Sequence, residues 1–297
     1  MNIFLAMMVA FFWGTTAAAT HIGFLDWPPL AMATLRALPA GMLLFALHPA
    51  WPKPGQWRVL LASAAVNVTL FFSLVFLVAQ NLPATLAAVG MSATPLVALA
   101  VTSVVTRSLP SVAQGIVALL LVGATVLLFD PAISGVTSLG IGAMFAAMLV
   151  MILGSLYLKQ ALQTVHWWTL VVWQLILGGL MLLPLGALQW WQNAELYSTA
   201  LTLHSDRVLS GLWLVLANTA LAYTIFMWVL TRISVVQFAF ASIANPVAGI
   251  LVGAMLVHEA FSMIEYALMA FMVVASLIAQ TLSQRRKSEP VPIPSEG

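Results

Sequence analysis

The 297-residue chain contains no cysteine and very little charge. The absence of cysteine excludes disulfide bonds, thiol catalysis and cysteine-ligated metal sites. Charged residues make up 6% of the chain, whereas about 25% is typical of a soluble domain. Hydrophobic residues make up 63%. A soluble fold of this size could not bury that much apolar surface, so we expect the chain to lie among membrane lipids.

The sequence also lacks the patterns on which enzymes and nucleotide-driven proteins depend. The stretch HEAF at 258–261 has no second histidine with which to form a zinc-protease helix. No group of histidines and carboxylates has metal-ligand spacing, no pair of acids lies inside an apolar run, and there is no P-loop. The lysines and arginines are dispersed, which argues against a nucleic-acid partner. We therefore predict no enzyme activity, no metal and no cofactor.

Long apolar runs occupy most of the chain. A bilayer core about 30 Å thick needs roughly 20 apolar residues in a helix that crosses it. The runs predict an all-α polytopic membrane protein with ten transmembrane helices, near residues 3–23, 30–48, 58–79, 84–105, 112–129, 139–158, 167–187, 208–230, 234–256 and 266–283. The longest connection, around 188–207, is polar and is expected on one membrane surface.

The basic residues are divided unequally between the two sets of loops that this map creates. One set holds eight of them, and the other holds only Arg207: the eight are Lys53, Arg58, Arg107, Lys159, Arg232, Arg285, Arg286 and Lys287. Cytoplasmic loops carry the excess of Lys and Arg. We therefore expect a multi-pass protein of the cell inner membrane with both termini in the cytoplasm and a disordered cytoplasmic tail at 284–297.

The two halves of the chain match each other at an offset of 151 residues. Residues 67–101 align with 218–252 without a gap, which pairs Asn67 with Asn218 and Pro95 with Pro246. Each half contains five predicted spans, an odd number, so the second copy must be inserted upside down. The pattern predicts a 5+5 inverted repeat around a central cavity, with repeats at 3–130 and 139–283. Such repeats are typical of alternating-access transporters whose site lies near the bilayer midplane.

Two stretches resemble a known family. FFWGTTAAATHIGFLDWPPLAMATLRALPAG, at 11–41, resembles the first two helices of the EamA-type branch of the drug/metabolite transporter superfamily. ANPVAGILVGAMLVHEAFS, at 244–262, resembles the proline-containing fourth helix of a repeat in that family, with its Glu at position 259. The first repeat departs from this pattern, because Ser108 stands where that Glu would fall. The resemblance covers about residues 3 to 283 and implies ten helices around a cavity and export or exchange of small metabolites.

Arg36 is the only charged residue well inside a predicted span. It lies six residues from the outer end of its span, so roughly 9 Å deep at 1.5 Å per residue. A charge at the centre of a membrane helix costs at least about 2.5–3.5 kcal/mol, so something should compensate it. Pro39 leaves the Leu35 carbonyl without its helical donor. One interpretation is that Arg36 reaches toward the surface or ties helices together. The other is that it lines the cavity, where it meets a carboxylate or polarises the gate.

Further candidates for the cavity wall are polar or aromatic residues away from the predicted span ends: Trp13, Gly14, Thr15, Asn67, Gln174, Asn218 and Tyr223. The alternatives are helix packing for Trp13 and interhelical hydrogen bonds for the polar groups, since polar groups in lipid need partners. Gln174 pairs with Arg36 when the repeats are aligned with a two-residue gap. Pro39, Pro95 and Pro246 are expected to kink their helices, either as hinges or to accommodate packing.

The interpretation that joins these features is a permease that moves small metabolites by alternating access. A cavity with one cationic group, aromatic rings and neutral amides suits a zwitterion or weak anion with an apolar part, so amino acids or related amphipathic compounds are the expected substrates. The alternatives are an importer of sugar or nucleotide-type solutes and a membrane-embedded enzyme or lipid-handling protein. Because the acids lie at span ends and no histidine lies near the midplane, facilitated diffusion or exchange is favoured over obligatory proton symport.

Overall fold

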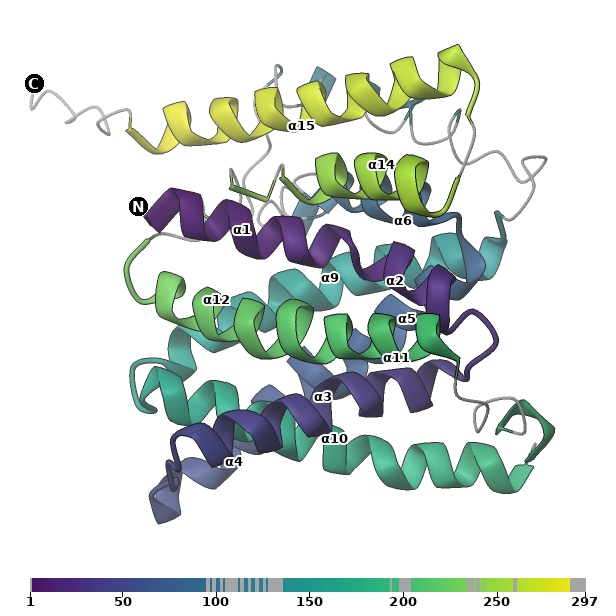
Figure 1. Cartoon of the computed structure of the whole chain (residues 1–297). Coiled ribbons are helices and arrows are strands. Elements are labelled where there is room, and N and C mark those ends of the chain that lie inside the picture. The colour runs from purple at the N-terminus through teal and green to yellow at the C-terminus, as the bar shows by residue number, and fades with distance from the viewer. Residues whose placement is uncertain are drawn as a thin grey trace, which may run out of the picture.

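The computed structural model describes residues 2–94, 136–192, 194–197, 204–233, 244–258 and 261–288, with isolated positions between 97 and 127 and between 238 and 242. Over these residues the chain forms helices and no strands. Figure 1 shows the helices packed side by side in one bundle. The start of α1 (Asn2–Gly14) and the end of α15 (Met263–Ser288) lie at the same end of that bundle.

The helices follow the apolar runs of the sequence, with short turns between them. After α1 come α2 (Thr16–Gly23), α3 (Pro29–Leu47), α4 (Trp57–Ala64), α5 (Phe71–Asn81), α6 (Ala84–Gly90), α9 (Ser138–Ala161), α10 (Trp167–Gln192), α11 (Ser205–Leu212), α12 (Ala222–Leu230) and α14 (Ala244–Leu256). Short 3₁₀ turns are η1 (Pro54–Gln56), η3 (Met91–Ala93) and η4 (Ala194–Tyr197), and the π-helical segments are η2 (Ala65–Leu70) and η6 (Trp213–Leu221).

Within the described residues, six helical runs are long and apolar enough to cross a membrane. They are Asn2–Gly23, Pro29–Leu47, Pro54–Asn81, Ser138–Ala161, Trp167–Gln192 and Ser205–Leu230. These runs coincide with the predicted first, second, third, sixth, seventh and eighth spans. They fit the expectation of an all-helical polytopic membrane protein.

The other four predicted spans are described only in part. The fourth span begins with α6, and α14 and α15 fall within or across the predicted ninth and tenth spans. Pro95, Glu259 and most of 112–129 lie outside the described residues.

Two predicted boundaries differ from the structure. The polar connection was expected to begin at 188, but α10 continues to Gln192, because Leu188 and the two following tryptophans still suit an amphipathic helix end. The tail was expected to begin at 284, but α15 continues to Ser288, so its first residues are helical. Residues 289–297 lie outside the described part of the chain.

The helices α3 and α10 form an antiparallel pair that glycines bring into close contact. A side chain at Gly41 would collide with the backbone nitrogen of Ile176, and one at Gly179 would collide with Leu38. Small residues at helix contacts let backbones approach closely inside membranes. Another face of α3 carries Arg36, which is buried, and α3 also packs against η6.

Two of the predicted kink residues have defined positions. Pro39 lies inside α3, which runs through it without interruption. Pro246 lies in the first turn of α14, where a missing N–H is tolerated because the first helical N–H groups have no partner within the helix. Pro246 therefore stands at the beginning of the described helix and not in its middle.

Candidate functional site

The first membrane-crossing run is interrupted at Thr15, between α1 and α2. Gly14 ends α1 against the backbone of α14, and a side chain there would collide with the Asn245 carbonyl oxygen. Thr15 Oγ1 donates to the Phe12 carbonyl at 2.7 Å. The close approach that Gly14 permits is therefore made to another helix, so helix packing accounts for this glycine.

Asn218 joins this interruption to the helix run Ser205–Leu230. Its side chain is fully buried, and its Oδ1 accepts a hydrogen bond from Thr16 Oγ1 at 3.1 Å. Its Nδ2 donates to the Phe12 carbonyl and contacts Thr15 Oγ1 at 3.4 Å. Trp213 Nε1 also donates to Thr15 Oγ1, at 2.8 Å. Both ends of the Asn218 amide are thus used to hold two helices together.

Asn218 lies in the π-helical segment η6, and its neighbour Thr219 is the direct partner of Arg36. Thr219 Oγ1 donates to the Leu214 carbonyl at 2.7 Å and accepts a hydrogen bond from Arg36 Nε at 2.7 Å. A π-helix displaces the normal hydrogen-bond ladder by one residue, and such segments are frequent at functional sites. The π-segment therefore presents a hydroxyl and a carbonyl to α3 at the depth of Arg36.

Arg36 is buried, with 2% of its surface exposed. Besides Thr219, its guanidinium makes a long contact of 3.5 Å from Nη2 to the Asn218 carbonyl. The guanidinium carbon lies 4.3 Å from the centroid of the Phe72 ring and 5.9 Å from that of Phe76. No carboxylate in the described part of the chain pairs with it, since the ion pair found there joins Arg207 to Asp26. Among the described residues, the charge of Arg36 is therefore solvated by neutral groups.

Aromatic rings extend the surroundings of Arg36 toward α1. The Tyr223 ring lies 5.5 Å from Phe72 and 5.2 Å from Trp13, measured between ring centroids. Trp13 also packs on Phe226 at 5.0 Å. The indole N–H of Trp13 is buried and has no hydrogen-bond partner among the described residues. The result is an aromatic wall that begins at Phe72, beside the Arg36 charge, and ends at Trp13 with its unpaired N–H.

The structure thus brings together five of the residues singled out in the sequence: Trp13, Thr15, Arg36, Asn218 and Tyr223. Sequence reasoning missed Thr219 and Phe72. Thr219 could have been found as the second polar residue beside Asn218 in an apolar run. Phe72 carries no such signal, because the run 67–81 contains several phenylalanines and only packing selects one of them.

Asn67 and Gln174 lie elsewhere. Asn67 is in the π-segment η2, where its Nδ2 donates to the Ser63 carbonyl at 3.3 Å and its Oδ1 leaves no room for a side chain at Gly154. Gln174 is fully buried on α10, and both of its amide atoms lack a hydrogen-bond partner within the described residues. Neither residue makes a described contact with Arg36.

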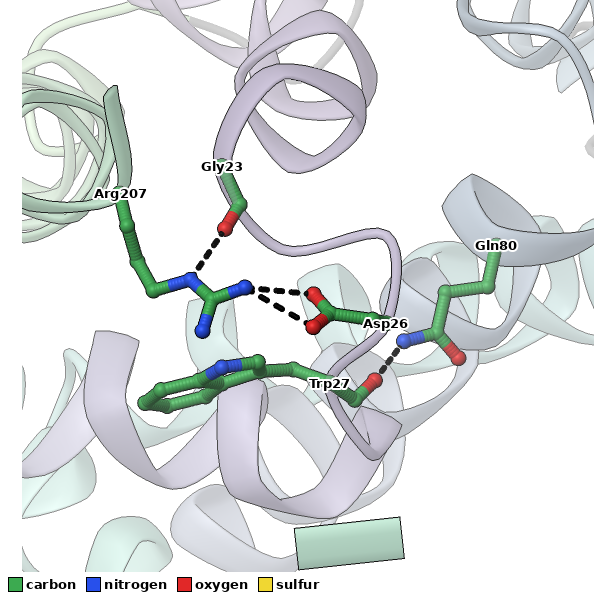
Figure 2. A network of polar contacts seen from close by, with 5 residues as sticks. All are labelled: Gly23, Asp26, Trp27, Gln80 and Arg207. Atoms are coloured by element: carbon green, nitrogen blue, oxygen red, sulfur yellow. Dashed lines mark hydrogen bonds and ion pairs between the residues drawn. The ribbon is translucent and has the colours of Figure 1, made fainter. Parts of the chain in front are cut away.

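A polar cluster gathers around Arg207, as Figure 2 shows. Arg207 Nη2 contacts both carboxylate oxygens of Asp26 at 2.9 Å, and Arg207 Nε donates to the Gly23 carbonyl at 3.0 Å. The Arg207 guanidinium lies 5.7 Å from the Trp27 ring, and Gln80 Nε2 donates to the Trp27 carbonyl. This cluster connects the start of the run Ser205–Leu230 to the turn between α2 and α3.

A groove of about 500 Å³ lies between α3 and α10. Its lining is apolar and includes Leu35, Leu38, Pro39, Leu183 and Trp190. Arg36 is not among the lining residues. This groove therefore belongs to the outer surface of the helix pair and is separate from the site around Arg36.

Nothing in the described ranges resembles a metal centre: there, no three histidine or acidic side chains lie close enough together to hold an ion.

Comparisons with known proteins give consistent results. The sequence model of the EamA-like transporter family matches residues 1–130 and 138–281. Protein PecM of Dickeya dadantii (strain 3937) is 28% identical over 292 residues, which cover 94% of this chain and 93% of PecM. A crystal structure of another protein matches with a TM-score of 0.65 at 18% identity, covering 97% of this chain and 99% of that one. At that identity the last likeness concerns the fold alone.

Proposed function

The chain belongs to the EamA-like transporter family, and from that premise we propose that it exports or exchanges amino acids or related amphipathic compounds by alternating access. Membership confirms the resemblance carried by the stretches 11–41 and 244–262. It also makes the chain a multi-pass membrane transporter of the drug/metabolite transporter superfamily. The substrate, the ten-helix topology and the direction of transport are the parts that we add.

The proposed architecture is ten transmembrane helices in a 5+5 inverted repeat, with repeats at 3–130 and 139–283. Two observations support it. The π-segments η2 and η6 end at Leu70 and Leu221, which are 151 residues apart, the same offset that aligns the two halves. In addition, α3 packs against η6 while α10 packs against η2. The second helix of each repeat thus contacts the π-segment of the other repeat, as a two-fold relation requires.

The proposed substrate site is the region around Arg36. The observation that carries it is a buried guanidinium that has no carboxylate partner within the described part of the chain. Keeping such a charge inside a membrane helix costs at least about 2.5–3.5 kcal/mol. Thr219 and two phenylalanine rings compensate it in part. A substrate carboxylate would supply the missing negative charge.

The aromatic wall favours a substrate that also has an apolar part. Tyr223 and Trp13 continue the row of rings that starts with Phe72 beside the charge, and the Trp13 N–H is available to an acceptor on the substrate. An amino acid has both the carboxylate and, in many cases, the apolar side chain. A polyamine should be rejected, because its charges repel Arg36 and no described acid lies beside the site.

The proposed coupling is facilitated diffusion or exchange, without an obligatory proton. Proton-coupled carriers usually use an Asp, Glu or His inside the membrane. The described acids, Asp26, Glu195, Asp206 and Glu265, lie in turns or at helix ends.

The proposed location is the cell inner membrane with both termini in the cytoplasm. The end of the bundle that holds the start of α1 and the end of α15 also holds the ends of α3, α9 and α12 (Figure 1). Lys53 follows α3, Lys159 lies in the last turn of α9, and Arg232 follows α12, so this end fits the cytoplasmic side under the positive-inside rule. A reporter fused after Lys287 should be cytoplasmic, and one in the loop between α10 and α11 should be periplasmic. A periplasmic reporter after Lys287 would contradict this orientation.

The direct test is efflux from proteoliposomes that contain the purified protein. Vesicles are loaded with labelled amino acids, a labelled sugar, a labelled nucleotide or a labelled polyamine, and each is followed with and without an imposed pH gradient. We expect efflux of one or more amino acids that does not require the gradient. Selective transport of the sugar, the nucleotide or the polyamine would overturn the substrate class, and strict dependence on the gradient would overturn the uncoupled mechanism.

A further inference from the structure

Gln174 is a buried polar side chain that the hydrogen-bond network leaves unused. It lies on α10 with none of its surface exposed, and neither Nε2 nor Oε1 has a hydrogen-bond partner among the described residues. Buried polar groups in folded proteins are almost always paired, so an unpaired one needs an explanation. Apolar residues would fill the same space without this penalty. The amide is therefore expected to find its partners in another state of the protein.

A second unpaired group lies on α4, a helix that packs against α10. The helices α4 and α10 are in contact, and a side chain at Gly178 would approach the Ala64 carbonyl. Gln174 lies one turn before Gly178, and Ser63 precedes Ala64 in α4. Ser63 is also fully buried, and its Oγ has no partner within the described residues. Neighbouring turns of the packed helices α4 and α10 thus carry three polar atoms without a hydrogen-bond partner among the described residues.

The position of Gln174 complements that of Arg36. In the antiparallel pair, Gly41 contacts Ile176 and Leu38 contacts Gly179. Gln174 therefore lies level with about Leu43. Arg36 is seven residues from Leu43, which is roughly 10 Å along the helix axis at 1.5 Å per residue. Arg36 contacts the π-segment η6. Gln174 lies one turn from Gly178, which contacts Val68 of the π-segment η2. The two residues therefore occupy related places in opposite halves of the molecule.

We infer that Gln174 and Ser63 form a second, uncharged station for the amino acid substrate, toward the membrane side that carries Lys53 and Lys159. This inference rests on the proposed function. A carboxamide offers both a donor and an acceptor, which complement the carboxylate and the ammonium group of a zwitterion. In the conformation described, the station is closed and its polar atoms are unpaired. In the conformation that opens to the side carrying Lys53 and Lys159, the substrate leaves Arg36 and forms hydrogen bonds with the polar atoms of Gln174 and Ser63.

The first test replaces Gln174 by leucine, which is apolar and of similar length. The Gln174→Leu protein should have an unfolding temperature equal to or above that of the wild type, because the unpaired amide is gone. Its amino acid flux should fall by about tenfold or more, while the equilibrium dissociation constant at Arg36 changes by less than about threefold. The matched control is Thr169→Val, another buried polar residue of α10, which should transport like the wild type.

The second test uses the natural absence of cysteine. In a Ser63→Cys protein, a small thiol reagent should modify the cysteine from the Lys53 and Lys159 side only, and the transported amino acid should slow the modification. The control is Ser155→Cys on α9, where the native hydroxyl donates to the Met151 carbonyl at 2.7 Å. Modification at that position should not depend on the amino acid.

The outcomes separate this inference from the proposed function. Absence of amino acid flux in the wild type would overturn the proposed function itself. Wild-type flux that persists in Gln174→Leu would reduce the amide to a buried structural group and overturn the second station alone. Should Gln174→Leu fail to fold, the Ser63→Cys experiment decides, because a cysteine that is unreactive, or reactive without protection by the amino acid, contradicts the station.

Discussion

Replacing Thr219 by valine isolates the hydrogen bond that orients Arg36. Valine keeps the β-branched shape of threonine but removes the hydroxyl, which accepts from Arg36 Nε and donates to the Leu214 carbonyl, each at 2.7 Å. The Arg36 N–H would then be left unpaired in a buried site. The guanidinium would lose the contact that fixes its plane above the Phe72 ring.

The size of the effect follows from measured hydrogen-bond energies. A hydrogen bond to a charged group contributes about 1.5–3 kcal/mol in soluble proteins, whereas interhelical bonds in a membrane protein average about 0.6 and reach about 1.7 kcal/mol. We take about 1–2 kcal/mol, which corresponds to a factor of roughly 5–30 in an equilibrium constant. The KM of Thr219→Val for the transported amino acid should therefore rise by that factor.

The assay is amino acid flux in proteoliposomes at several substrate concentrations. Thr219→Ser keeps the hydroxyl and should resemble the wild type. Thr231→Val is the matched control, since the Thr231 hydroxyl donates only to the nearby Trp228 carbonyl and is exposed. An unchanged KM in Thr219→Val, with Thr231→Val also unchanged, would refute the argument that Thr219 positions Arg36 for substrate.

Two further predictions concern the stability of the bundle. Asp26→Asn should lower the free energy of unfolding by only about 0.5–1 kcal/mol, because Asp26 is 44% exposed and the ion pair is screened. Arg207→Gln should lower the free energy of unfolding by less in the Asp26→Asn background than in the wild type, because its ion-pair partner is already gone. Strictly additive losses in thermal unfolding would contradict the pairing. Gly14→Ala should cost about 1–3 kcal/mol because its methyl group collides with a backbone carbonyl. Gly142→Ala, which has free space around it, should be neutral or stabilising, and equal effects at the two glycines would disprove the close contact.

The membrane-crossing helices could be predicted because apolar length is a property of the sequence itself. Six predicted spans have a matching helix. The ends were less predictable: α10 continues past 188 to Gln192, because an amphipathic end near the interface has no sharp hydropathy boundary. The composition of the sequence does not predict the π-segments. The alignment of the two halves does pair Asn67 with Asn218, and each of these residues lies in one of the π-segments.

The surroundings of Arg36 depend on contacts between residues far apart in the chain. Its burial could be anticipated from its isolation in an apolar run. Its partner Thr219 is 183 residues away, and no local pattern connects them. Gly14, a candidate for the cavity wall, lies against the backbone of α14, and nothing in its local sequence indicates that contact. Helix packing, which the sequence does not display directly, decides both cases.

The central claim is that Arg36 binds the substrate, and efflux of a labelled amino acid from proteoliposomes tests it most directly. Arg36→Ala should reduce efflux to background while expression and thermal unfolding stay close to wild type. Arg36→Lys should recover little efflux. A lysine ammonium group cannot donate to Thr219 and also offer a carboxylate the two parallel N–H groups of a planar guanidinium. The control is Arg232→Ala, which removes an exposed arginine stacked on Trp228 at 3.6 Å and should leave efflux unchanged. Wild-type efflux in Arg36→Ala would contradict the account and reduce Arg36 to a residue that holds helices together.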